Sequence, residues 1–134
     1  MTLRELSRYY NLQKRLARAE EMLESFITTS CLGAQVITGM PHASGTRDKV
    51  GDLAAEITDM QDKIKQLERE GRQAKREISA YIDTIQNDQT RMIFRLRFLR
   101  CMTWKEVAAL VGGRNTASGV KMICYRYISE HKKL

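Results

Sequence analysis

The residues with the clearest chemical signature lie between positions 105 and 126. Cationic, amide, hydroxyl and aromatic side chains follow one another there at helical spacing: Lys105, Arg114, Asn115, Ser118, Lys121, Met122, Tyr125 and Arg126. Arginine, lysine and asparagine can bond base edges in the DNA major groove, and cations also contact phosphates. These residues are therefore the candidate DNA contacts, with Lys105 placed for a phosphate.

Positive charge is concentrated around these residues. Residues 1–90 hold 13 Lys/Arg and 14 Asp/Glu, whereas residues 91–134 hold 10 Lys/Arg and two acids, a net charge of +8. A basic end on a neutral body is typical of a protein that binds the phosphate backbone. Arg95, Arg97 and Arg100 are further candidates for phosphate contacts, although one of them could instead pair with Glu106. A solvated basic surface is the plain alternative.

Catalytic and metal-binding patterns are absent from the sequence. His42 and His131 are the only histidines, and no Cys/His cluster has the spacing of metal ligands. The glycine pair at Gly112 does not continue into a phosphate-binding loop with its lysine and serine. We therefore expect no enzyme activity, no cofactor and no metal.

Two short helices joined by a glycine turn are predicted over residues 103–128. Thr103 and Glu106 form a capping box at the start of the first helix. Gly112 and Gly113 end it, because glycine adopts left-handed backbone angles at low cost. Asn115, Thr116 or Ser118 can cap the second helix. Its buried stripe is predicted to be Val120, Ile123, Cys124 and Tyr127.

A third helix is predicted just before this pair. Asn87 or Asp88 can cap its first turn. Its expected apolar stripe is Met92, Ile93, Leu96 and Leu99. The following Trp104 is expected to pack against the protein rather than stack on a base.

Two long amphipathic helices are predicted upstream. The first covers about residues 2–28, with the apolar stripe Leu6, Tyr9, Leu12, Leu16, Ala19, Leu23 and Phe26. The second starts near Asp52 and keeps a heptad seam: Leu53, Ile57, Met60, Ile64, Leu67, Gly71, Ala74, Ile78, Tyr81 and Ile85. The glycine-rich stretch 29–51 between them has no helical period and is expected to be a loop.

These elements predict an all-α protein with two domains. Residues 1–86 would form a long antiparallel helical hairpin, a coiled coil with the long loop 29–51. Residues 87–134 would form a small helix-turn-helix domain. The hairpin could dimerise or dock on a partner, and a dimer would suit two DNA half-sites.

The segment "IDTIQNDQTRMIFRLRFLRCMTWKEVAALVG" resembles the fourth region of sigma factors, and the turn "GGRNTASGV" is about two residues longer than theirs. The stretch "ITGMPHASGTRDKVGDLAAEI" before a long helix is similar to phage and prophage regulators related to the ArpU and RinA late-gene regulators. This resemblance implies a sequence-specific DNA-binding regulator of phage transcription. Such a protein would act with host RNA polymerase in the cytoplasm of a bacterial cell.

Two other functions fit the same pattern. A small-terminase-like protein also joins a helix-turn-helix to a coiled coil. Such a protein forms a ring that recognises packaging DNA. A coiled-coil adaptor would bind RNA polymerase without touching DNA. The sequence also has neither the apolar run of a membrane span nor the start of a signal peptide. Its three scattered cysteines suggest reduced thiols.

Overall fold

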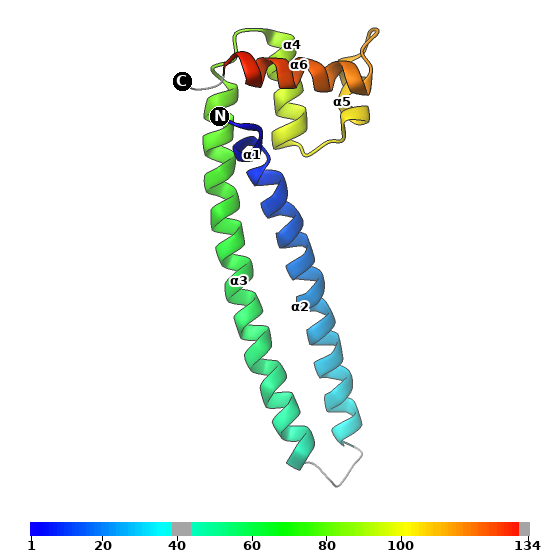
Figure 1. The fold of residues 1–134 in the computed structure, drawn as a ribbon. Coiled ribbons are helices and arrows are strands. Elements are labelled where there is room, and N and C mark those ends of the chain that lie inside the picture. Colours follow the sequence, from blue (N-terminus) through cyan, green and yellow to red (C-terminus); the bar gives the residue numbers. More distant parts are fainter. Residues whose placement is uncertain (39–43, 132–134) are drawn as a thin grey trace. The chain divides into compact units, whose positions relative to one another are not determined.

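The protein is all-helical, as predicted. The computed structural model describes residues 1–38 and 44–131, and these contain no β-strand. Along the chain follow α1 (Leu3–Leu6), α2 (Arg8–Thr38), α3 (Ser44–Ile82), α4 (Asp88–Phe94), the π-helical segment η1 (Arg95–Leu99), α5 (Trp104–Val111) and α6 (Ala117–Glu130) (Figure 1). Within the described ranges, no helix is long and apolar enough to cross a membrane.

The chain divides into two compact units. One comprises Met1–Leu12 together with Glu70–Leu134, and the other is Gln13–Arg69. This division does not fall between residues 86 and 87: the last part of α3, from Glu70, groups with the helices that follow, and residues just after α3 bond α4 and η1. Arg91 Nη1 donates to the carbonyl of Ile85 at 2.9 Å, and Arg95 bonds the carboxylate of Asp83. The predicted domain boundary itself stays a prediction.

The predicted helix over residues 2–28 forms with a small interruption. Thr2 and Glu5 make a capping box at the start of α1. The Ser7 amide donates to Leu3 O at 2.9 Å, and the Asn11 amide donates to Ser7 O at 3.0 Å. Helical hydrogen bonding therefore passes from α1 into α2 across Ser7.

In the unit Gln13–Arg69, the predicted apolar positions are the covered ones. On α2, Leu16, Ala19, Leu23 and Phe26 are partly buried among mostly exposed neighbours. On α3, Ile64 and Leu67 are buried, and the seam positions before them are partly buried. A helix buries one stripe because residues three and four apart lie on the same side.

The stretch predicted as a loop differs in the structure. α2 continues to Thr38 and α3 begins at Ser44, so most of the range 29–51 is helical, and residues 39–43 lie outside the described residues. Single glycines such as Gly33 and Gly51 weaken a helix by about 1 kcal/mol each, relative to alanine, without ending it.

In the other unit, the core forms around α4, η1, α5 and α6. Its fully buried side chains include Ile78, Ile82, Ile85, Ile93, Phe94, Val107, Val120 and Cys124. The ring of Phe94 lies 5.4 Å from that of Phe98 and 5.3 Å, edge-on, from that of Tyr127. Such aromatic pairs add about 0.5–1.5 kcal/mol to the effect of buried area. This cluster fixes the inner side of α6.

The apolar stripe predicted for the helix after Asn87 is partly wrong. Asn87 caps α4 as expected, but Ile93, Phe94 and Phe98 are the buried residues, and Met92 is 50% exposed. The aromatic rings bury more apolar area than methionine, and they decide which side turns inward. The helix also widens in η1, where the Arg100 amide donates to Arg95 O at 3.0 Å, five residues back.

Candidate nucleic-acid interface

The sharp connection between α5 and α6 follows from local sequence. Thr103 and Glu106 form the predicted capping box of α5. Gly112 has φ 75° and ψ −165°, and Gly113 has φ 67°. A Cβ at either position would meet no atom within 4 Å, so the backbone angles, and not crowding, require glycine there.

Thr116 is the residue that caps α6, out of the three considered. Its hydroxyl accepts a hydrogen bond from the Gly119 amide at 3.0 Å. The side-chain amide of Asn115 instead donates to Gly112 O at 2.8 Å. This hydrogen bond links the last part of the connection to its first residue. The amide nitrogen of Asn115 is thus already bonded within the protein.

The two sides of α6 differ sharply in exposure. Val120 and Cys124 are fully buried, and Ile123 and Tyr127 are partly buried, as predicted. The candidate contacts Ser118, Lys121, Met122, Tyr125 and Arg126 are all exposed. At 100° per residue, Lys121 and Arg126 lie about 140° apart around the helix, so they flank this exposed side.

Two residues on the exposed side of α6, Lys121 and Tyr125, contact aromatic rings. The ring of Trp104 meets the ring of Tyr125 edge-on at 6.2 Å, and Lys121 Nζ lies 5.5 Å from the centre of the Tyr125 ring. Trp104 also stacks with the Arg97 guanidinium at 4.6 Å, so it packs against the protein as expected. These contacts restrict the side chains of Tyr125 and Lys121.

Lys105 and Arg114 lie near the connection and are both exposed. Lys105 is in the first turn of α5, and Arg114 lies between the glycine pair and the cap of α6. With Lys121 and Arg126 they make up the set that we call the exposed cations. All four residues are exposed.

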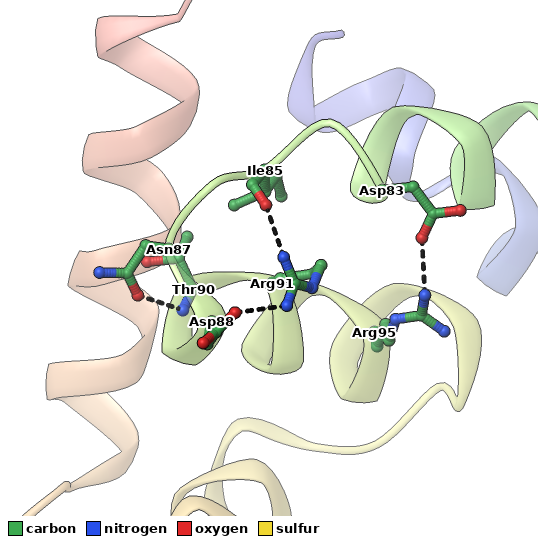
Figure 2. Close-up of polar contacts among 7 residues, drawn as sticks. All are labelled: Asp83, Ile85, Asn87, Asp88, Thr90, Arg91 and Arg95. Atoms are coloured by element: carbon green, nitrogen blue, oxygen red, sulfur yellow. Dashed lines mark hydrogen bonds and ion pairs between the residues drawn. The ribbon is translucent and has the colours of Figure 1, made fainter.

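The arginines of α4 and η1 are used differently (Figure 2). Arg91 bonds both Ile85 O and the carboxylate of Asp88, while Arg95 pairs with Asp83 at 2.6 Å. Arg97 donates to Met102 O at 2.8 Å and contributes to the stack on Trp104. We call Arg91, Arg95 and Arg97 the engaged arginines. Glu106 was the alternative partner for Arg95, Arg97 or Arg100, and its carboxylate is bonded to Thr103 in the capping box.

Of the arginines proposed as additional phosphate contacts, Arg100 is exposed and Arg95 is exposed but paired. Arg97 is partly buried and bonded, so its guanidinium already has protein partners. The sequence signal for these Arg97 contacts was the closeness of Met102 and Trp104, which lie five and seven residues downstream. A long arginine side chain can reach both.

Two cysteines lie in this part of the chain as free thiols, Cys101 and Cys124. Burial raises the pKa of the Cys124 thiol to about 12, and the positive charge of Arg97 opposes this rise. Burial also raises the pKa of Cys101, with Arg97 and Lys75 opposing the rise. Both thiols are therefore protonated near neutral pH, which makes them poor nucleophiles.

No group of three or more His, Cys, Asp or Glu side chains in the described ranges is placed to hold a metal ion. The candidate contacts on α6 form an exposed cationic and polar side of this helix. Such a side can attract an anionic surface.

A family model matches residues 34–121, and its description is a protein of unknown function, DUF1492. The chain belongs to this family. The match includes α5, the glycine connection and the first residues of α6, so the candidate site begins inside the family region. Among the curated proteins and the solved structures, none matches the chain.

Proposed function

We propose that this DUF1492 protein is a sequence-specific DNA-binding transcription regulator of phage genes. In this proposal, α5, the connection and α6 act as a sigma-like helix-turn-helix. The observation that carries it is the division of α6 into a buried side, with Val120 and Cys124, and an exposed side, with Lys121 and Arg126. Helix-turn-helix proteins present the second helix to the major groove in this manner.

The approach to DNA would begin at the start of α6. Ser118 and Lys121 would meet base edges, and Arg114 and Lys105 would contact phosphates on either side. Met122, 59% exposed, would contact a thymine methyl group. Asn115 would contribute its carbonyl oxygen and its second N–H, since one N–H of its amide bonds Gly112 O.

The rest of the chain would serve assembly. The covered stripes on α2 and α3 support an antiparallel hairpin, which would contact host RNA polymerase. The proposed setting is the cytoplasm of a bacterial cell carrying the phage. No catalytic step and no cofactor are part of this proposal.

The direct test is selection of binding sequences from a pool of random DNA duplexes, followed by fluorescence anisotropy on the selected duplex. Lys121→Ala and Arg126→Ala are compared with wild type, and Lys65→Ala, an exposed lysine on α3, serves as the matched control. We expect each α6 substitution to weaken binding and to reduce the slope of log K against log salt by about 1. The control should leave both unchanged.

Three outcomes would change the proposal. Failure to enrich any sequence, with no binding at low salt, would favour the polymerase adaptor. Equal binding to every duplex would remove sequence specificity. Specific binding by an oligomer larger than four would favour the small-terminase-like function.

A further inference from the structure

A groove on the unit formed by Met1–Leu12 and Glu70–Leu134 is not used by the proposed DNA site. It has a volume of about 460 Å³ and is lined by Lys75, Ser79, Met92, Arg95, Leu96, Leu99 and Arg100. Its lining thus comes from α3, α4, η1 and the residue after η1. Three cations stand around three apolar side chains.

The composition of this groove favours a polypeptide over DNA. Met92 is 50% exposed, and Leu96 and Leu99 are partly exposed, so apolar surface lies open between the cations. Phosphates would bond Lys75 and Arg100 but would leave the apolar surface wet. An acidic segment with an apolar residue satisfies both, as in helix-in-groove recognition.

The basic surface continues beyond the groove. A second hollow of about 540 Å³ shares Lys75 and Ser79 with it and adds Arg72, Arg76, Ala80 and Asp83. Ser79 and Ala80 are small, so a helix can approach this side of α3 closely. The surface is long enough for several turns of an acidic helix.

The same chain carries a segment of matching chemistry. Residues 20–62 hold eight Asp/Glu and two Lys/Arg, a net charge of −6, whereas the rest of the chain carries +13. On α2, Ala17, Glu20, Glu24 and Ile27 recur at three- and four-residue steps, and all four are exposed. Ile27 is 42% exposed, so this stripe presents an apolar side chain next to its two carboxylates.

We infer that the groove binds this acidic stripe of a second copy of the chain. Glu20 and Glu24 pair with Lys75 and Arg100, and Ile27 covers the apolar surface next to Met92. Each chain carries both surfaces, and in the dimer that we infer each groove binds the acidic stripe of the other chain. This interface differs from the heptad seam, where Ile64 and Leu67 are already buried in the single chain. It does not rest on DNA binding.

The test is sedimentation equilibrium of the full chain without DNA, at low and at high salt. We expect wild type to dimerise and the dimer to weaken as salt rises. Lys75→Glu with Arg100→Glu should raise the dimer Kd at least about tenfold, since like charges across an interface repel. Glu20→Lys with Glu24→Lys should do the same.

The decisive variant combines all four reversals. It should restore the dimer Kd to within about threefold of wild type, because the pairs form again with exchanged signs. Arg4→Glu with Arg15→Glu changes the net charge as much as the groove reversal does, on exposed arginines outside both surfaces. This control should dimerise almost as wild type does.

Circular dichroism of each variant establishes that it is folded. A wild-type chain that stays monomeric at about 100 µM in low salt would overturn the inference, since a weaker Kd has no useful affinity. So would a dimer that ignores the groove reversal, or a fourfold variant that stays monomeric while folded. Loss of DNA binding by Lys121→Ala has no bearing on any of these results.

Discussion

Two groups of cations have the same charge but different uses. The engaged arginines lie in α4 and η1, and the exposed cations lie in α5, α6 and the connection between them. Arg97 donates to Met102 O and lies 4.6 Å from the Trp104 ring, so its charge helps to hold the chain where η1 leads into α5. Arg126 is exposed on the outer side of α6. A high local charge therefore combines cations that build the fold with cations that remain available for a ligand.

The largest expected effect separates these groups by stability. Arg97→Ala should lower the free energy of unfolding by about 2–3 kcal/mol, since it removes a charged hydrogen bond and a cation–π contact. Urea unfolding measures this change, and Lys65→Ala is the control. A loss below about 0.5 kcal/mol would place Arg97 with the exposed cations.

The position of the exposed cations depends on the glycine connection. Gly112→Ala should lower the free energy of unfolding by about 2 kcal/mol, because its φ of 75° and ψ of −165° form a region that only glycine adopts freely. Ser118→Ala, a nearby exposed position, should change it by less than about 0.5 kcal/mol. Similar stability of the two variants in thermal unfolding would contradict this account.

The buried side of α6 should govern stability at alkaline pH. The pKa of Cys124 is raised in the folded chain to about 12, so its contribution is complete below pH 9 and is lost as pH rises toward 12. Over that window one proton corresponds to about 1.4 kcal/mol per pH unit. The free energy of unfolding, measured from pH 8 to 11, should fall less steeply with pH for Cys124→Ala than for wild type. Parallel pH profiles would exclude Cys124 as the titrating group.

A smaller effect on stability is expected for the exposed ion pair between Arg95, one of the engaged arginines, and Asp83. The Asp83 and Arg95 side chains are 57% and 45% exposed, so solvent screens their attraction. A double-mutant cycle with Asp83→Ala and Arg95→Ala should give a coupling of about 0.2–1 kcal/mol in urea unfolding. A coupling above about 2 kcal/mol would show that this corner of the fold depends on the pair far more than its exposure suggests.

The smallest expected effect on stability belongs to Lys121 and Arg126. Replacing each by alanine should change the free energy of unfolding by less than about 0.5 kcal/mol, since neither side chain supports the core. The same purified variants serve in the anisotropy experiment, which keeps stability and binding separate. A marked loss of stability would move them into the engaged group and would remove the simplest interpretation of weakened binding.

Much of the local structure could be predicted from short-range signals. The Thr103–Glu106 box, the cap at Asn87 and the glycine pair each act within one turn of helix, and each is present. The covered stripes of α2 and α3 follow from helical period alone. The predicted end of the first helix near residue 28 was too early, because a single glycine such as Gly33 only weakens a helix. α2 ends at Thr38, directly before Gly39 and Pro41 in the sequence, which are the stronger stop signals.

The sequence by itself determined the all-helical character, the Thr103–Glu106 capping box, the glycine connection and the concentration of positive charge after residue 90. These depend on backbone preferences and on residue spacing along one helix. Only the tertiary structure decided that Arg91, Arg95 and Arg97 bond the protein, and that Phe94 and Phe98 turn inward instead of Met92. It also formed the groove beside Lys75. The reason is physical: a long arginine side chain can reach many partners, and its choice depends on which carbonyls and rings the folded chain brings within reach.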